Sequence, residues 1–266
     1  MRTQHLMVAA VAVAAWLGIR PGSLVAQTGF NGVITFKQQD EDGKTSTFTQ
    51  TTKGRKIRLD GMGGRESGAM IMDGDAHTMM MVSTSEKKAY VMTEEDAKQM
   101  GEMMGPMAER MKAKGDKGDD AKLSFKNTGR QETVAGVRCE VWHGTFDDGT
   151  GETKEGDACL AKGVGFALGE MMAANPMMRR DQHQLKQMEQ FQSLTAGGKG
   201  VLKATSTKDG KTRVEFEATS IEPKTVSDDV FKAPAGYEEV RMADMMSQMR
   251  GAMKGMPQQH GHATPH

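Results

Sequence analysis

The sequence has few cysteines, few aromatic residues and no net charge, and each shortage excludes a class of protein. Its 266 residues contain only 2 Cys, too few for a scaffold of several disulfides or for a four-cysteine zinc site. Aromatic residues make up 5% of the chain, so rings cannot fill a large core. The 35 basic residues balance 35 acidic ones, which leaves no electrostatic footprint for nucleic acid or an anionic membrane surface.

Short catalytic motifs are missing as well. The chain has no G-x-S-x-G, no H-E-x-x-H and no P-loop. The glycine-rich segment Gly61–Arg65 lies between two expected strands, so no helix N-terminus follows it to bind phosphate. The acidic pairs Glu94-Glu95 and Asp147-Asp148 fall at an expected helix start and in an expected turn. We therefore expect no enzymatic activity and no cofactor.

The N-terminus has the pattern of an export signal. A 14-residue apolar run, residues 6–19, follows Arg2 and His5, and the small-residue stretch Ser23–Ala26 offers a cleavage site before Gln27. The run is shorter than the about 20 apolar residues that span a bilayer. We expect removal of residues 1–26, a periplasmic location and a mature chain without a transmembrane segment.

The two cysteines are spaced to pair across a hairpin. The segments on either side of the turn Asp147–Gly151 have the pattern of strands. A turn centred on Gly149 pairs positions whose numbers sum to 298, as those of Cys139 and Cys159 do. Outside the cytoplasm this favours a disulfide, worth roughly 3 kcal/mol by the chain-entropy model. A Cys–His dyad with His143 is disfavoured, because four residues of strand span about 13 Å.

The mature chain alternates groups of short strands with helical stretches. The expected strands are residues 32–37, 45–52, 55–59, 69–72, 77–82, 89–92, 123–127, the two strands of the cysteine hairpin, 200–208 and 212–221. Thr93 has the position of an N-cap for a helix that runs to about Lys112. A second helical stretch is expected near 164–194 and a third near 238–254. We divide the chain into a signal (1–26), a β-sheet domain with inserted helices (27–240), and a Met-rich C-terminal helix with a disordered, His-containing tail (241–266).

Methionine, with 25 residues, marks one face of each expected helix. The first and last helices carry it at identical offsets of 0, 3, 4, 7 and 11, which is one side of an α-helix. These residues are Met100, Met103, Met104, Met107 and Met111, and Met242, Met245, Met246, Met249 and Met253. The middle stretch contributes Met171, Met172, Met177, Met178, Leu185, Met188 and Phe191.

Three interpretations of these faces stay open. Ordinary core packing against the sheet is the first. Thioethers fix side-chain positions poorly and suit surfaces that adapt to varied ligands, so a flexible apolar pocket is the second. Thioethers are also soft ligands that select copper(I), and the tail residues His260, His262 and His266 could hold copper(II) or nickel. His77 and His183 fit a structural and a surface role.

The order of several segments resembles a bacterial family of exported proteins known as domain of unknown function (DUF) 4412. These segments are Gly29–Phe36, Gly54–Asp60, Ala69–Asp73, Glu132–Trp142 and Asp228–Tyr237. The family is distantly similar to the periplasmic lipoprotein carriers LolA and LolB. The resemblance covers about residues 29–240 and implies a curved, unclosed antiparallel β-barrel with an apolar concave face under helices. It brings no catalytic residues.

Taken together, we expect an α+β protein, a curved antiparallel unclosed β-barrel whose concave face is covered by Met-rich helices. The leading hypothesis is a periplasmic, non-enzymatic binder or carrier of a lipid or acyl-type apolar ligand. The expected ligand wall is Met100, Met103, Met104, Met107, Met111, Met171, Met172, Met188, Met245 and Met249. A Met/His copper-handling protein and a structural or partner-binding envelope module are the alternatives. An apolar cavity of roughly 300 Å³ or more would favour the carrier.

Overall fold

A computed structural model describes residues 30–40, 42–62, 68–102, 122–147, 153–169, 171, 193–208 and 210–247. Twelve strands make up most of this part of the chain: β1 (Gly32–Gln39), β2 (Thr45–Lys53), β3 (Lys56–Asp60), β4 (Gly68–Asp73), β5 (Thr78–Ser83), β6 (Lys88–Met92), β7 (Lys122–Val134), β8 (Val137–Asp147), β9 (Thr153–Lys162), β10 (Lys199–Lys208), β11 (Lys211–Pro223) and β12 (Glu238–Arg241). A short 3-10 helix, η3 (Asp228–Phe231), lies between β11 and β12.

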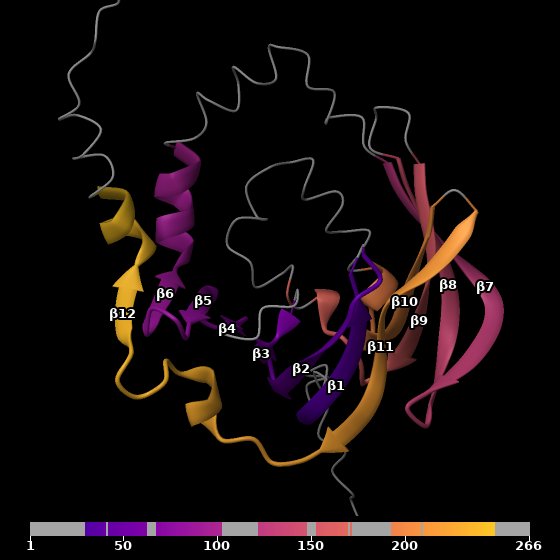
Figure 1. Cartoon of the computed structure of the whole chain (residues 1–266), viewed down its shortest axis with the longest axis horizontal. Helices are drawn as coiled ribbons and strands as arrows, with labels where there is room; N and C mark the ends of the chain where they lie inside the picture. Colours follow the sequence, from indigo (N-terminus) through magenta and orange to yellow (C-terminus); the bar gives the residue numbers. More distant parts are fainter. Residues whose placement is uncertain are drawn as a thin grey trace, which may run out of the picture.

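All twelve strands belong to a single sheet in the order β12-β6-β5-β4-β3-β2-β1-β11-β10-β9-β8-β7. Neighbouring strands run antiparallel, except that β12 pairs in parallel with β6. The order begins and ends at different strands, so the sheet is unclosed, and it curves strongly around one concave side (Figure 1).

The sheet consists of two meanders that meet at β1. Strands β1 to β6 follow one another in space, as do β7 to β11, and β1 pairs with both β2 and β11. The pairing of β1 with β11 joins residues from opposite ends of the described chain; for example, the hydroxyl of Thr219 donates to the carbonyl of Thr35 (3.2 Å). This seam holds the two meanders together.

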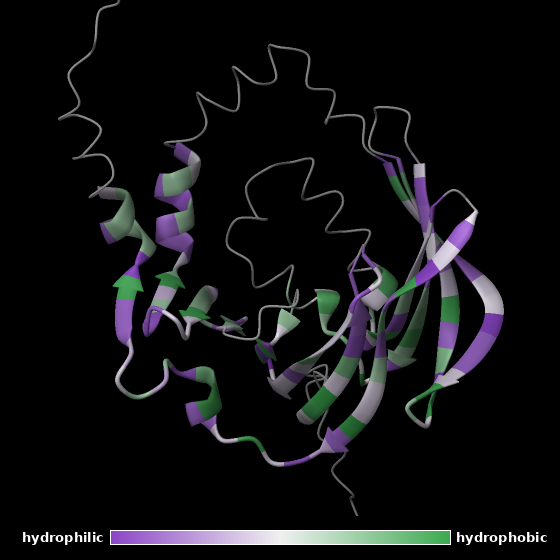
Figure 2. Ribbon diagram, viewed as in Figure 1, coloured by the Kyte–Doolittle hydropathy of each residue, from purple (hydrophilic) through white to green (hydrophobic). Residues whose placement is uncertain are grey.

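The hydrophobic core lies on the concave side of β1, β2 and β3, and the hydropathy of the residues along the strands is shown in Figure 2. Ile34, Phe36 and Phe48 are at most 2% exposed. Phe36 stacks on Phe48 at 4.8 Å between ring centroids, and Phe166 and Phe216 pack edge-on or tilted against them. Four of the nine phenylalanines of the chain therefore fill one cluster.

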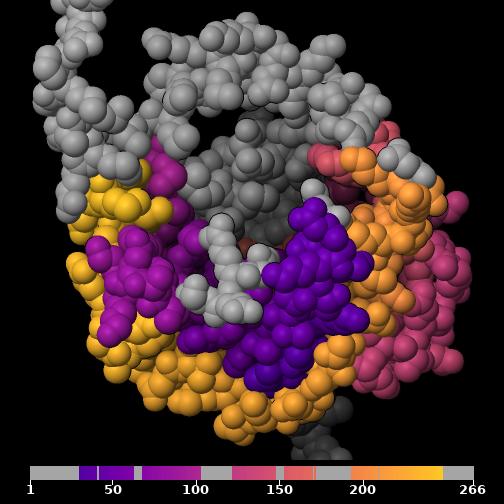
Figure 3. Space-filling view, viewed as in Figure 1, coloured from indigo at the N-terminus to yellow at the C-terminus, as the bar shows by residue number. Residues whose placement is uncertain are grey.

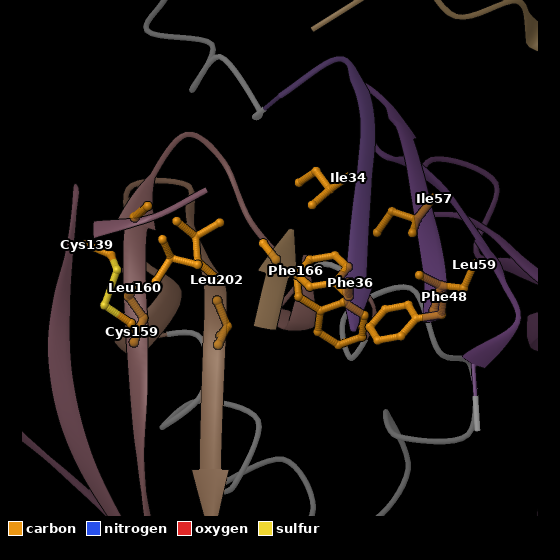
Figure 4. Close-up of a cluster of buried hydrophobic side chains, with 14 of the residues drawn as sticks. Ile34, Phe36, Phe48, Ile57, Leu59, Cys139, Cys159, Leu160, Phe166 and Leu202 are labelled. Atoms are coloured by element: carbon orange, nitrogen blue, oxygen red, sulfur yellow. A yellow bond between two sulfur atoms is a disulfide. The ribbon is translucent and has the colours of Figure 1, made fainter. Parts of the chain in front are cut away.

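The predicted disulfide is confirmed. Cys139 and Cys159 join β8 to β9 with a Cα–Cα separation of 5.4 Å, and they lie in the main core (Figure 4). The hairpin register differs from the expected one: Cys159 lies opposite Val141, so the bridge runs diagonally between the strands. The pairing is therefore shifted from the expected one, and the 5.4 Å between the two Cα atoms still lies within the range that a disulfide spans.

A second apolar cluster lies on the opposite, convex face of β4 and β5. Ala69, Ile71 and Val82 pack there against Val226 and Phe231 from the connection between β11 and β12. In the space-filling view this connection follows the outer margin of the molecule beneath the first strands (Figure 3). Ion pairs of Asp228 with Lys53 (2.6 Å) and Lys56 (3.5 Å) fasten it.

The α+β expectation, with Met-rich helices across the concave face, is wrong. The described chain is almost entirely sheet, and its helical residues are confined to 62, 94–102, 168–169, 171, 193–195, 242–247 and η3. The helices that begin at 94 and 242 continue from β6 and β12 at one end of the sheet instead of lying across its floor (Figure 1). The floor is covered by the non-helical segment 163–167, which supplies Phe166 to the core.

The helix start predicted at Thr93 is confirmed. Thr93 caps the helix that starts at residue 94: its Oγ1 accepts from the amide of Asp96 (3.2 Å), and the Asp96 carboxylate accepts from the amide of Thr93 (2.9 Å). Near the C-terminus, residues 238–241 form β12 and not the start of a helix. Within the described residues, no helix is both long and apolar enough to cross a membrane.

Candidate functional site

A buried glutamine side chain ties a covering segment to the centre of the concave face. Gln50 on β2 is 1% exposed. Its Nε2 donates to the carbonyl of Gly165 (3.0 Å), and its Oε1 accepts from the amide of Ala167 (3.0 Å). Gln50 therefore holds the segment 163–167 across the sheet, with both ends of its amide paired as burial requires.

A shallow hollow beside Gln50 is too small for a lipid. It is lined by Ile57, Gly165 and Lys199 among others, and its volume is about 30 Å³. That space suits roughly one water molecule, whereas ligand pockets measure about 300 Å³ or more. Around Gln50 the sheet is therefore packed protein and not a binding cavity.

Beyond the packed floor, the concave face of β4, β5 and β6 is lined by methionine. One cross-strand row runs from Gln50 through Leu59, Met70 and Met81 to Tyr90. The next row runs from Thr52 through Ile57, Met72 and Met79 to Met92. We call Met70, Met72, Met79, Met81 and Met92 the methionine face. Met72 lies in the main core and Met70 and Met79 pack against it, so the methionine face continues the core toward the far end of the sheet.

Along the first of these rows the exposure of the side chains rises from Leu59 to Met81. Leu59 is 1% exposed, Met70 is half-buried and Met81 is 41% exposed. In the second row Met72 and Met92 are 2% and 7% exposed. Met81 is therefore the open end of an otherwise buried apolar row.

The two faces of the same strands use different apolar residues. The convex face of β4 to β6 carries Ala69, Ile71, Val82, Ala89 and Val91, with Met80 as the exception. Most of these are small or β-branched residues, and the connection containing η3 covers the cluster around Ala69, Ile71 and Val82. The concave face uses unbranched thioethers, which have lower β-propensity and many accessible conformations.

Three of the ten residues predicted to form the ligand wall lie within the described part of the chain. Met171 is half-buried and packs against the main core. Met100 and Met245 are half-buried in the helices that follow β6 and β12. The remaining predicted wall residues lie outside the described part of the chain: Met103, Met104, Met107, Met111, Met172, Met188 and Met249. The tail histidines His260, His262 and His266 lie outside it as well.

Sequence reasoning missed the methionine face because it searched for the helical repeat. The signal for a strand is a spacing of two, and the pairs Met70/Met72 and Met79/Met81 have it. What the sequence alone does not show is that β4 and β5 pair in the register that places Met70 opposite Met81 and Met72 opposite Met79.

A charged cluster lies on β7, β8 and β9. His143 Nδ1 donates to Asp157 Oδ1 (2.9 Å), and Arg130 donates to the other carboxylate oxygen. Burial raises the pKa of Asp157, but the hydrogen bonds from His143 and Arg130 outweigh it, so the pKa lies below its ordinary value. His143 has no cysteine thiol to activate, since Cys139 is bonded to Cys159. Among the described residues, no group of three His, Cys, Asp or Glu side chains could hold a metal ion.

Most of this sheet lies within a segment that matches the model of a known protein family. The family model described as "Domain of unknown function (DUF4412)" matches residues 30–237, from shortly before β1 to the residue before β12. The chain belongs to the DUF4412 family.

Comparisons with individual proteins add little to the family assignment. No match was found for this DUF4412 chain among curated proteins. Among solved structures it is similar to the crystal structure of an uncharacterized conserved protein from Thermus thermophilus, with a TM-score of 0.45 and 7% sequence identity. The similarity covers 81% of this chain and 91% of the other.

Proposed function

We propose that this DUF4412 protein is an exported, non-enzymatic binder of an apolar, lipid or acyl-type ligand, and that the ligand lies on the methionine face of β4 to β6. The observation that carries the proposal is the difference between the two faces of these strands. The convex face, covered by the protein's own chain, is built mostly from Ala, Ile and Val, whereas the partly open concave face is built from Met.

Methionine is a poor choice for a strand in a core of fixed shape, and it is favoured only where a flexible surface is useful. Ile and Val fit a strand better than Met, and a core of fixed shape is better specified by residues with few rotamers. A wall that has to follow ligands of different shape gains from thioethers, whose three rotatable bonds let the surface repack. Binding is then driven by removal of apolar area from water, at about 25 cal/mol per Å².

The position of the methionine face also suits a ligand. It borders the packed aromatic floor on one side, which gives a bound chain a rigid wall to lie against. Met81 at 41% exposure marks the open side from which a ligand would enter. The apolar run at residues 6–19, which predicts export, and the disulfide both support an oxidising compartment such as the periplasm.

The proposal is tested with a fluorescent fatty acid added to the delipidated mature chain, together with native mass spectrometry of protein isolated from the periplasm. We expect co-purified lipid and saturable dye uptake by the wild type. The double change Met70→Gln and Met81→Gln places polar groups of similar size in the open row, and we expect it to weaken dye binding by about tenfold or more.

The matched control is Met62→Gln. Met62 is 42% exposed, nearly the same as Met81, but it follows the end of β3 and lies outside the methionine face. It should leave dye binding unchanged. A wild-type protein that neither carries lipid nor takes up dye, or a loss that is equal in both variants, contradicts the proposal.

A further inference from the structure

Four methionines of the concave face form the corners of a rectangle. Met70 and Met81 lie directly opposite each other on β4 and β5, and so do Met72 and Met79. Opposed residues on antiparallel strands have their Cβ atoms about 4.5–5.5 Å apart. Residues two apart on one strand are about 7 Å apart. All four side chains leave the sheet on the same side.

A rectangle of this size matches the reach of a methionine side chain. Its centre lies roughly 4 Å from each Cβ, as the strand spacings require. Because the thioether is unbranched and flexible, each sulfur can turn toward that centre from its own corner. Met92, opposite Met79 on β6, adds a fifth thioether at the side.

We propose that Met70, Met72, Met79 and Met81 form a binding site for a soft monovalent cation, copper(I) or its analogue silver(I), with thioether sulfur as the protein ligand. Thioethers select soft ions and bind hard ones poorly. The ion enters from the side of Met81, which is 41% exposed, and Met72, which is 2% exposed, forms the base. No electron is transferred, since the ion binds in the oxidation state in which it arrives.

This site does not depend on the proposed ligand. It needs sulfur atoms, whereas an apolar ligand needs only apolar area. Leucine separates the two properties, because it keeps the volume and the hydrophobicity of methionine and removes the sulfur. Volume-conserving changes of this kind are the best tolerated in a packed core, so the variants are expected to fold.

A thioether site is also distinguishable from a histidine site by its pH dependence. Methionine does not titrate, whereas histidine, with an ordinary pKa of about 6.5, is protonated and loses metal at pH 5. Binding by the methionine rectangle therefore persists at pH 5, whereas binding by the tail residues His260, His262 and His266 is lost there.

The titratable groups beside the rectangle do not change this expectation. Tyr90 ends the Met70–Met81 row, and its hydroxyl donates to Glu86 (2.7 Å). This hydrogen bond raises the pKa of Tyr90, so the phenol stays neutral at both pH values. Lys88 lies opposite Ser83 in the adjoining row and pairs with Glu238 (3.8 Å).

The experiment titrates the full mature chain with silver(I), and anaerobically with copper(I) against a chromophoric competitor, at pH 7 and pH 5. We expect at least one ion bound at both pH values, with X-ray absorption showing sulfur neighbours. The triple change Met70→Leu, Met79→Leu and Met81→Leu should lower the affinity at pH 5 by about tenfold or more. Met81→Leu alone, at the most exposed corner, should give a smaller loss in the same direction.

Met80→Leu is the matched control, because Met80 lies on the same strand and packs on the convex face. It should leave ion binding unchanged. Equal affinity of the wild type and the triple leucine variant, or no ion bound at pH 5, overturns the proposal. Uptake of the fluorescent fatty acid by the triple variant is measured in parallel: its retention while ion binding is lost shows that the two functions are separate, and its absence in the wild type affects only the apolar-ligand proposal.

Discussion

Gln50 shows how one side chain determines what the concave face can hold. Buried amides are costly unless their polar atoms are paired, and Gln50 pairs both ends with the backbone of Gly165 and Ala167. The same contacts keep the segment 163–167 against the floor, where Phe166 completes the aromatic cluster. The packed floor thus depends on an interaction between residues 115 positions apart.

Replacing Gln50 by methionine tests this role. Gln50→Met keeps the size of the side chain but leaves the Gly165 carbonyl and the Ala167 amide without their partner. We expect the free energy of unfolding to fall by about 2–4 kcal/mol, since each buried group left unpaired costs roughly 1–3 kcal/mol. Urea denaturation followed by far-UV circular dichroism measures the change.

Gln39→Met serves as the control for the Gln50 variant. The Gln39 amide donates to the Gly43 carbonyl in an exposed turn, where water replaces the lost bond. Its effect should stay within about 0.5 kcal/mol. Equal losses in the two variants would show that burial of Gln50 is not what makes its hydrogen bonds important.

Single residues were predicted from the sequence when their partner lies nearby in the chain. Cys139 and Cys159 are 20 residues apart on one hairpin, so the spacing indicated the bridge even though the register differs from the expected one. Thr93 was predicted as a cap because its partner is three residues away. The role of Gln50 was not predictable, because its partners come from a distant, irregular segment.

At the scale of elements, Asp157 links three strands beyond its own. Its side chain on β9 accepts from Arg130 on β7 and His143 on β8, and its backbone amide donates to Thr205 on β10 (3.0 Å). The carboxylate is the common partner of Arg130 and His143. Burial raises its pKa, and the hydrogen bonds from these two side chains lower the pKa by more.

This linkage predicts an acid-dependent stability. Because the pKa of Asp157 is lower in the folded than in the unfolded chain, its contribution is complete above the ordinary pKa of a carboxyl and is lost as the pH falls through the folded pKa. The variant Asp157→Asn should therefore be less stable than the wild type near pH 6. The difference in melting temperature between the two proteins should become smaller toward pH 3. Thermal melting at several pH values measures it.

The control for the pH series is Asp42→Asn. Asp42 is an exposed residue of the turn between β1 and β2. Replacing a solvated carboxylate of this kind should change the stability by no more than about 0.5 kcal/mol across the series. A gap between wild type and Asp157→Asn that is constant from pH 6 to pH 3 would show that Asp157 acts through packing and not through its charge.

The positions of the strands were easier to predict from the sequence than the packing partners of the helices. Short β-forming runs between turn residues gave most strand positions, including 69–72, 89–92 and 200–208. The Met spacing in the helices indicated amphipathic faces but not what they pack against, because periodicity contains no information about the partner. The centre of the concave face is filled by Phe36, Phe48 and Phe216 of the sheet together with Phe166 of the segment 163–167, so it is packed without a helix.

At the scale of the whole molecule, stability should decrease from the seam to the edges of the sheet. β1 is paired on both sides, whereas β7 and β12 are the two end strands. We expect hydrogen exchange of β1 and β11 amides to require global unfolding, and β7 and β12 to exchange through local opening at much lower free energy.

Hydrogen exchange monitored by mass spectrometry measures this gradient with the wild-type chain. Peptides from β2 and β10, next to the seam, provide the internal reference because they also have two paired neighbours. If β7 proved as slow to exchange as β1, the sheet would have to be protected at its end by contacts that the described residues do not show.

The arrangement of strands also bears on how the chain is made. Strand β1 leaves the ribosome before every other strand of the sheet, but Thr219 of its partner β11 emerges 184 residues after Thr35. At about 5–20 residues per second, translation alone separates the two by roughly 10–40 s. Through that interval one side of β1 has no partner while β2 to β6 can already assemble, so the sheet cannot be completed until its last long strand has been synthesised.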